Sequence, residues 1–327
     1  MDEAVARANS NVALVQSWGA RLPELNLPYT GSISLTLDGP CSTVRWSNRP
    51  DLATDRITID DRPAQGASAL RLQAYVDLVR RAGAGRSPCE VTIETTPGGV
   101  PGVGRSTATF AALALAGSAA LGRRPTPREL SILARRGTGS AARSVFGGFV
   151  ESVGGELGDG SDCYAEPLAE PQHWPLAALI AVVECDAATP RATVSAHDLK
   201  RSPFFPAWLE AHDDDLEAVR DAILARDLDR LGRAMEHNCL KARAVALAAA
   251  PPIISWAPAT LAVIERVHAL RAAGRGAYFT VGAGPHVTVL CAPDDSAPVA
   301  HALANVAGVA HVVRTRPGGA AELVQRA

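Results

Sequence analysis

A glycine-rich loop that runs directly into an apolar helix constrains this chain more than any other feature. Residues 96–109 read TPGGVPGVGRSTAT, and residues 110–116 continue as FAALALA. Small residues let the backbone approach an anion, and the first N–H groups of a helix have no partners within that helix. The pattern therefore predicts a phosphate-binding loop at a helix N-terminus. It is neither the Walker loop nor the dinucleotide fingerprint, and an ordinary loop before a core helix is the alternative.

Composition sets broad limits on the class of protein. The 327 residues suffice for one large or two medium domains, and 47% hydrophobic with 20% charged residues is typical of globular proteins. A net charge of −2 argues against nucleic-acid binding, and no apolar run reaches the roughly 18 residues that would span a membrane. The N-terminus lacks a secretory signal, and the six scattered cysteines are typical of reduced thiols. We therefore expect a cytoplasmic protein with no nucleic-acid or membrane partner.

Hydrophobic periodicity predicts alternating strands and helices. Strands are expected at 32–38, 42–46, 56–60, 89–95, 179–183, 277–280, 287–290 and 310–314. Helices are expected at 69–81, 109–121, 126–135, 205–224, 228–249, 257–273 and 296–306, with Thr126 as an N-cap before Pro127. The order lacks the regular period of a doubly wound sheet, so we predict an α+β fold with two domains, 1–178 and 179–327.

Four segments carry a resemblance to a known family. They are NVALVQSWGAR at 11–21, RRGTGSAARSVFGGF at 135–149, PPIISWAPAT at 251–260 and Ala-Gly-Pro at 283–285. In this order they resemble the diphosphomevalonate decarboxylases of the GHMP kinase superfamily. The resemblance implies a two-domain GHMP kinase fold, in which an N-terminal domain like domain 2 of ribosomal protein S5 precedes a ferredoxin-like C-terminal domain. It also implies ATP and Mg²⁺ as cofactors, a small hydroxy acid as substrate and a homodimer.

The same resemblance suggests which residues form the site. It implies that the ATP phosphates lie against Gly102, Val103, Gly104, Arg105, Ser106 and Thr107. It implies substrate contacts from Gly139, Ser140, Arg143, Ser17, His197 and Arg71, although Arg71 on a solvated helix face is an equal alternative. The guanidinium of Arg143 suits a carboxylate or phosphate by its two-pronged geometry. We take Arg143, Ser106 and His286 as catalytic candidates, while the metal ligands stay unassigned, with Glu151 and Asp186 as either ligands or structural residues.

Several positions depart from the family pattern. Gly282 stands where the family has an aspartate beside the reacting hydroxyl, and glycine cannot act as a base. Ala20 replaces a lysine, Ser17 a tyrosine, and His286 an asparagine. Arg105 replaces a small hydroxyl residue, where it would either contact the phosphates or crowd them. The nucleotide side of the site is thus kept while the substrate side is replaced.

These departures bear on the reaction. The family phosphorylates a tertiary 3-hydroxyl and then releases phosphate and carbon dioxide together. Phosphoryl transfer depends on positioning and electrostatics, so it can survive loss of a carboxylate base. We therefore expect a kinase that phosphorylates mevalonate or a related β-hydroxy acid without decarboxylation, like the mevalonate 3-kinases.

Two alternatives stay open. One is decarboxylation of the same or another β-hydroxy acid, in which His197, Asp198 or His286 takes over part of the missing role, since histidine can shuttle protons near neutral pH. Lys200 and Arg201 either replace the missing cations or belong to a solvated loop. The other alternative is an inactive paralogue that binds a nucleotide or metabolite, against which the intact glycine loop and anion site argue.

Overall fold

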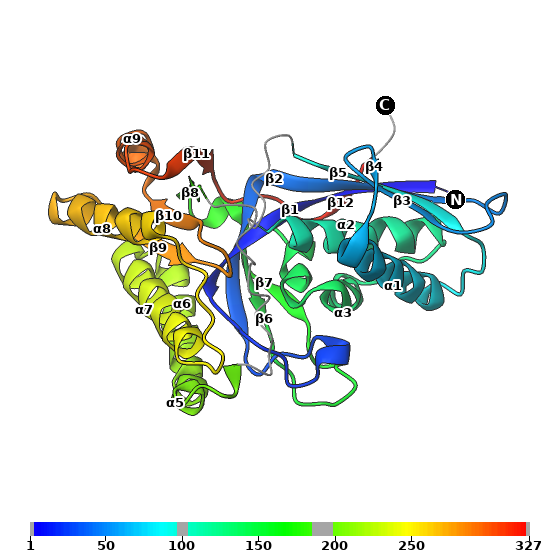
Figure 1. Ribbon diagram of the computed structural model, residues 1–327, viewed down its shortest axis with the longest axis horizontal. Helices are drawn as coiled ribbons and strands as arrows, with labels where there is room; N and C mark the ends of the chain where they lie inside the picture. Colours follow the sequence, from blue (N-terminus) through cyan, green and yellow to red (C-terminus); the bar gives the residue numbers. More distant parts are fainter. Residues whose placement is uncertain (1–2, 97–103, 185–198, 325–327) are drawn as a thin grey trace.

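Two sheets, each lined by helices, make up the computed structural model, which describes residues 3–96, 104–184 and 199–324 (Figure 1). The large sheet has the order β12-β1-β2-β5-β3-β4, and β6 and β7 extend it beside β2. The small sheet is antiparallel with the order β11-β8-β10-β9. The α+β class predicted from the sequence is confirmed.

The element bounds are as follows. The large sheet contains β1 (Glu3–Val15), β2 (Ser32–Asn48), β3 (Arg56–Ile59), β4 (Arg62–Pro63), β5 (Cys89–Thr95), β6 (Phe149–Ser152), β7 (Ala165–Ala169) and β12 (Glu322–Leu323). The small sheet contains β8 (Ala177–Val183), β9 (Ala277–Val281), β10 (Val287–Cys291) and β11 (Val309–Thr315). The helices are α1 (Gly66–Ala82), α2 (Arg105–Ala120), α3 (Pro127–Gly137), α5 (Phe205–Glu210), α6 (His212–Ala225), α7 (Leu228–Leu247), α8 (Pro258–Ala272) and α9 (Ser296–Ala304). Short 3-10 helices are η1 (Pro23–Leu25), η2 (Gly139–Val145), η3 (Pro171–His173) and η4 (Pro293–Asp295).

Helices α1, α2 and α3 cover one face of the large sheet (Figure 1). The central helix is α2, whose Phe110 and Leu113 lie in a core with Val44 and Trp46 of β2. Because α2 is buried on nearly every side, its N-terminus is held in a fixed place. Helix α3 begins with the predicted Thr126 cap, which forms a capping box with Glu129.

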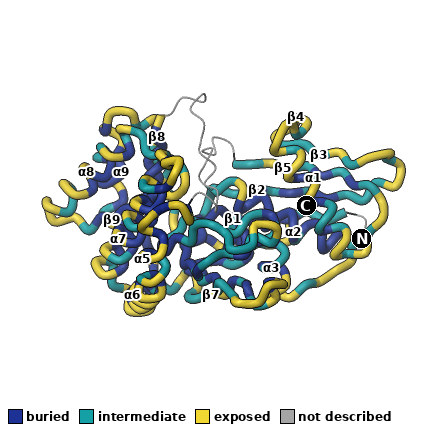
Figure 2. Tube along the Cα trace, turned by 60° about the horizontal axis from the view of Figure 1, so that its bottom comes forward, coloured by how far each residue is buried: buried dark blue, intermediate teal, exposed yellow. Residues whose placement is uncertain are grey.

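A second core joins the two sheets. It contains Leu14 of β1 and Ile33 of β2 together with residues of α6, α7 and one face of β8. Helices α8 and α9 pack on the other face of the small sheet. All seven residues of β8 are therefore buried, and the strand is dark blue in Figure 2. This shared core fixes the two bodies of the molecule against each other.

The structure differs from the predicted elements in several places. β1 begins at Glu3 although only residues 11–15 form an apolar run, because Ala6 and Ala8 pack under α2 with little hydrophobic signal. β2 is one strand through Gly39 and Pro40, and the predicted helix at 205–224 is divided into α5 and α6.

The predicted domain division also meets a complication. The boundary at 178/179 falls inside β8, and β12 at the chain end pairs with β1 in the large sheet. The N–H of Gly318 donates to the carbonyl of Thr36 at 2.8 Å, which secures this return of the chain. In the described part of the chain, no helix is long and apolar enough to cross a membrane.

Candidate functional site

A cavity of about 750 Å³ brings together most of the residues that the sequence singles out. Its walls come from the end of β1 with the loop that follows, the N-terminus of α2, η2, and the loop between β9 and β10. The predicted residues that line it are Ser17, Ala20, Gly104, Arg105, Ser106, Thr107, Gly139, Ser140, Arg143, Gly282 and His286. Segments far apart in the sequence thus meet at one site.

The first wall is the N-terminal turn of α2, residues 104–107, which we call the phosphate cradle. Gly104 caps the helix with φ +60°, and a Cβ there would lie 2.8 Å from the Cβ of Ser10. Only glycine fits this combination of conformation and close approach. The hydroxyl of Thr107 donates to the carbonyl of Gly104, while Ser106 is exposed at the cavity. The cradle therefore offers helix N–H groups and a hydroxyl to an anion, whereas Gly102 and Val103 lie outside the described residues.

Arg105 lies at the rim of the cradle and is paired with an acid. Its guanidinium lies 2.5 Å from a carboxylate oxygen of Asp60, which also accepts the N–H of Thr95 at 2.8 Å. Asp60 follows β3, so this ion pair ties the start of α2 to the neighbouring strands. The pair holds Arg105 at the edge of the site, where its charge is already balanced.

The second wall is η2, which a β-bulge in β1 fixes in place. The bulge lies between Asn9 and Asn11 in the pairing with β2, and bulges commonly re-aim side chains next to functional sites. The amide of Asn11 donates to the carbonyl of Ser140 at 3.0 Å and to the hydroxyl of Ser144 at 2.8 Å. η2 is thereby anchored with Gly139, Ser140 and Arg143 toward the cavity.

Arg143 is a buried cation, and among the described residues no acid forms an ion pair with it. The residue is 6% exposed and donates to the hydroxyl of Ser32, and its Nε has no hydrogen-bond partner among the described residues. Burial lowers the pKa of its guanidinium to about 10, so the group stays charged at neutral pH. A buried charge is costly unless it is paired, and this one lines a cavity. Arg143 therefore brings a buried positive charge to the cavity wall, a feature that suits an anionic ligand.

The third wall is the loop after β9, which carries the imidazole of His286. Nδ1 of His286 accepts the N–H of Val183 at 3.1 Å, which fixes the orientation of the ring in the wall. The catalytic role of His286 stays a prediction. A Cβ built on Gly282 would meet no described atom within 4 Å, so the described part of this wall leaves open space at that position.

Two predicted residues serve the fold instead of lining the cavity. Arg71 donates to the carbonyl of Gly137 at 2.7 Å and lies 4.7 Å over the ring of Phe110, so we leave it out of the site. Glu151 receives two hydrogen bonds from Arg220, at 2.6 and 2.9 Å. Because both oxygens of Glu151 are engaged, it is not placed to hold a metal.

Other predicted residues fall elsewhere. His197, Asp198 and Asp186 lie outside the described residues. Lys200 lies 5.0 Å over the ring of Tyr29 and is not part of the cavity wall. Across the described ranges, no group of three or more His, Cys, Asp or Glu side chains could hold a metal ion.

Three further side chains shape the site: Gln16, which stands where the family resemblance implies a lysine, and Arg135 and Arg243, which sequence reasoning missed. Gln16 lines the cavity and donates to the carbonyl of Val281 at 2.9 Å, which joins β1 to β9. Arg135 also lines it and donates to the carbonyl of Gly160 at 3.0 Å. Arg243 of α7 donates to the carbonyl of Gly282 at 2.7 Å from behind the wall. The sequence contains one indication that Arg243 is unusual, since it is the single charged residue in the alanine-rich stretch 242–250.

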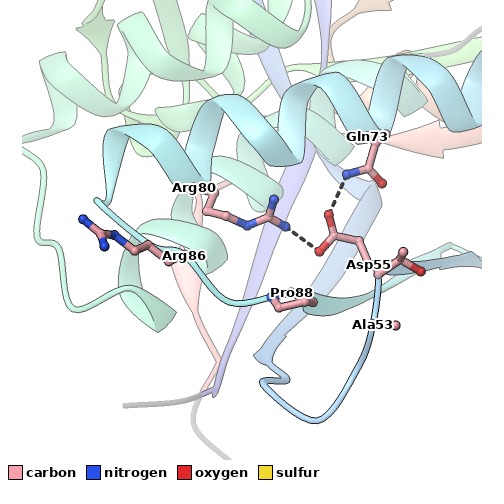
Figure 3. Close-up of a pocket in the computed structure, with 7 residues that line it drawn as sticks. Ala53, Asp55, Gln73, Arg80, Arg86 and Pro88 are labelled. Atoms are coloured by element: carbon pink, nitrogen blue, oxygen red, sulfur yellow. Dashed lines mark hydrogen bonds and ion pairs between the residues drawn. The ribbon is translucent and has the colours of Figure 1, made fainter.

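A second, smaller cavity of about 460 Å³ lies between α1 and the loop before β3 (Figure 3). Its central carboxylate, Asp55, accepts hydrogen bonds from Arg80 and Gln73, both at 2.5 Å. The N–H of Cys89 also donates to Asp55, at 2.8 Å. Because the charges are balanced within this cluster, we interpret the cluster as a structural contact that joins α1 to the edge of the large sheet.

Comparisons with known proteins agree on one family. A model described as "Diphosphomevalonate decarboxylase-like N-terminal domain" matches residues 8–165. Diphosphomevalonate decarboxylase of Ganoderma lucidum is 31% identical over 88% of this chain and 78% of the relative. Phosphomevalonate decarboxylase of Haloferax volcanii is also 31% identical, over 82% of each chain.

Solved structures extend the likeness to the whole fold. Mevalonate diphosphate decarboxylase from Staphylococcus aureus superposes with a TM-score of 0.91 at 28% identity, covering 99% of this chain and 98% of that one. A protein described as MDDEF, in complex with MVAPP, AMPPCP and magnesium, superposes with a TM-score of 0.90 at 30% identity over 99% of both chains. The two-domain fold of the GHMP kinases, which the sequence resemblance implied, is confirmed.

Proposed function

Because the chain belongs to the diphosphomevalonate decarboxylase family of GHMP enzymes, we propose that it transfers the γ-phosphate of ATP to the tertiary hydroxyl of a mevalonate-type β-hydroxy acid. In this step the hydroxyl oxygen forms a bond to the γ-phosphorus, the bond from that phosphorus to the bridging oxygen breaks, ADP leaves, and the hydroxyl proton passes to solvent. Catalysis of this kind rests on positioning and charge stabilisation.

One observation carries the proposal: the phosphate cradle and the buried guanidinium of Arg143 line the same cavity. The cradle presents helix N–H groups to the phosphates of a nucleotide. The guanidinium of Arg143, which donates to the hydroxyl of Ser32, adds a positive charge that attracts a carboxylate. Two anionic molecules held in one cavity are brought into the proximity that phosphoryl transfer needs.

The residues of the cavity fit ATP and Mg²⁺. A Cβ at Gly104 would lie 2.8 Å from the Cβ of Ser10, so glycine lets the first turn of α2 pack closely on β1 at the edge of the cavity. Mg²⁺ commonly keeps several waters and binds through substrate phosphates with few protein ligands. The exposed hydroxyl of Ser106 is the group of the cradle that would contribute a ligand. Binding of AMPPCP and magnesium by the relative MDDEF supports this assignment.

We further propose that the phosphorylated acid is released without loss of carbon dioxide. Gly282 and Ala20 place no charged side chain at these two positions of the cavity wall, and Nδ1 of His286 accepts a backbone N–H there. Residues of this kind can position the substrate hydroxyl for phosphoryl transfer. Cleaving a carbon–carbon bond requires a developing charge to be managed, and these residues do not supply a group for it.

A second candidate is complete decarboxylation. It is favoured by the names of the relatives, since the proteins from Ganoderma lucidum and Haloferax volcanii are both decarboxylases and align along most of this chain. In that case phosphate and carbon dioxide would leave together after the transfer, and ADP, phosphate and carbon dioxide would form in equal amounts.

One experiment separates the two candidates. The protein is incubated with ATP, Mg²⁺ and, in separate reactions, mevalonate, its 5-phosphate and its 5-diphosphate. ADP is measured by a coupled assay, and the acid is followed by mass spectrometry together with released carbon dioxide. We expect ADP to accompany an acid that has gained one phosphoryl group. Carbon dioxide equal to ADP would establish decarboxylation instead, and no acid-dependent ADP with any of the three would refute both.

A further inference from the structure

Arg243 is a second buried guanidinium beside the cavity. It is 2% exposed, and it lies between the indoles of Trp18 and Trp256, with its central carbon 4.8 and 5.0 Å from the two ring centroids. It donates to the hydroxyl of Ser255 at 2.5 Å and to the carbonyl of Gly282 at 2.7 Å. Its Nε has no partner among the described residues.

Among the described residues, no acid forms an ion pair with Arg243. Burial lowers the pKa of its guanidinium to about 10, against a smaller opposing effect of the Cys239 thiol, and the group stays charged at neutral pH. Stacking on two indoles recovers part of the lost hydration of the guanidinium. Removing a buried ion from water still carries a free-energy cost. A methionine of similar length would fill this space without that cost.

The contacts of Arg243 lead to the cavity wall. Trp18 and Gly282 both line the cavity, one from the loop after β1 and the other from the loop after β9. Arg243 itself lies behind them on α7 and is not part of the lining. One side chain thus holds two separate parts of the wall.

The hydrogen bond to Gly282 fixes the orientation of a peptide. Among the described residues the one cis peptide bond is Ala250–Pro251, so the bond from Gly282 to Ala283 is trans. In a trans peptide the C=O and the following N–H point in opposite directions. The carbonyl of Gly282 points to Arg243 behind the wall, and therefore the N–H of Ala283 points toward the cavity that Ala283 lines. Within the described residues, no acceptor pairs with the N–H of Ala283 or of Gly284.

We propose that Arg243 is a positioning residue for the acid substrate: it turns the Gly282–Ala283 peptide so that its N–H donates to an anionic oxygen of the substrate. Its positive charge behind the same peptide adds to this attraction. The opposite end of the acid is held by Arg143, on the wall formed by η2. This inference rests on the proposed function for the identity of the ligand, a β-hydroxy acid with an anionic group at each end.

The test compares three variants in the full-length protein. Arg243→Met keeps the length of the side chain and removes its charge and donors. Arg243→Lys keeps the charge and loses the two-pronged geometry. Arg233→Met is the matched control, because Arg233 lies on the same helix, is exposed, and pairs with Asp229 of that helix. Binding of mevalonate 5-phosphate and 5-diphosphate is measured by calorimetry, and the KM values for acid and ATP by ADP release.

We expect Arg243→Met to weaken binding of the acid about 10- to 100-fold, while the KM for ATP stays within about twofold of wild type. Arg243→Lys should recover part of the loss, and Arg233→Met should match the wild type. A merely structural role would instead weaken ATP and acid together and lower the melting temperature. That result, or an unchanged affinity for the acid in Arg243→Met, would overturn the proposal.

Failure of the proposed function is recognised separately. If the wild type binds one of the acids without forming ADP, the phosphotransfer proposal fails, and the affinities of the Arg243 variants still decide the present one. If the wild type binds neither acid, the role of Arg243 in holding an acid is refuted as well.

Discussion

The two ends of the cavity are built in different ways. The phosphate cradle at residues 104–107 comes from one continuous segment, and its donors belong to the first turn of a buried helix. The wall at Gly282–His286 has few functional side chains of its own, and it is shaped by groups from β8 and α7 behind it. A site for phosphates can thus be encoded locally, whereas a site for a particular acid depends on packing between distant segments.

Under the proposed function Arg143 contacts the acid directly, so its replacement should have the largest effect. Arg143→Met removes the one guanidinium lining the cavity that is buried with an unpaired Nε among the described residues. We expect kcat/KM for the acid to fall about 100-fold or more, because a charge-assisted contact to an anion is lost. Steady-state ADP release measures this kcat/KM, and Arg143→Lys is the control that should retain part of the activity. A loss confined to the KM for ATP would assign Arg143 to the nucleotide instead.

The cradle end is tested next by Gly104→Ala. The new Cβ would lie 2.8 Å from Ser10 at a backbone φ of +60°, so both crowding and strain oppose it. We expect the KM for ATP to rise about 10-fold and the free energy of unfolding to fall by about 1–3 kcal/mol. Gly122→Ala is the matched control, since Gly122 has φ +73° with nothing within 4 Å of the new Cβ. Equal effects of the two substitutions on the KM for ATP would disprove a role for close approach at Gly104.

The acid end is tested by adding a carboxylate in Gly282→Asp. The position has open space, and the neighbouring guanidinium of Arg243 would favour the ionised form of the new side chain. We expect the carbon dioxide released per ADP to rise several-fold over the wild type. Gly284→Asp, at a position that is equally open, controls for added charge alone. An unchanged ratio of carbon dioxide to ADP would show that a carboxylate at position 282 is not what the wall lacks.

The smallest effect concerns the junction of the two bodies. His212 of α6 is 1% exposed and its Nε2 lies 2.9 Å from the carbonyl oxygen of Gly31, next to β2. Burial lowers the pKa of His212 below its ordinary value of about 6.5, against smaller opposing contributions from the Gly31 carbonyl, Asp215 and Asp213.

The sign of the pH effect follows from that direction. Above pH 6.5 the ring is neutral in both the folded and the unfolded chain, so the full stability is present. As the pH falls below 6.5 the unfolded chain binds the proton first, and stability decreases. We expect the melting temperature to drop by a few degrees more in the wild type than in His212→Gln between pH 7.5 and 5.5. The same dependence of melting temperature on pH in both proteins would show that protonation of His212 does not affect stability.

Much of the fold and half of the site could be predicted from local sequence. Helix α2 and the Thr126 cap depend on neighbouring residues, and each lies within a few residues of its predicted place. Helix α2 begins at Arg105, four residues before the predicted start, because turn-forming glycines and hydroxyls look alike in a loop and in a first helical turn. The first part of β1 was not predicted, because the residues that it buries under α2 are alanines, which give little hydrophobic signal.

The sequence by itself determined that this chain presents a helix N-terminus to phosphates, because the conformation of Gly104 and the unpaired N–H groups of α2 follow from adjacent residues. Only the tertiary structure decided what each charged residue does. Arg71 donates to a backbone carbonyl, and Glu151 is paired with Arg220. Nε of Arg143 has no hydrogen-bond partner among the described residues, and Arg243 donates to the carbonyl of Gly282. The physical reason is that a charge takes its role from what surrounds it, and those surroundings come from segments that meet only when the chain folds.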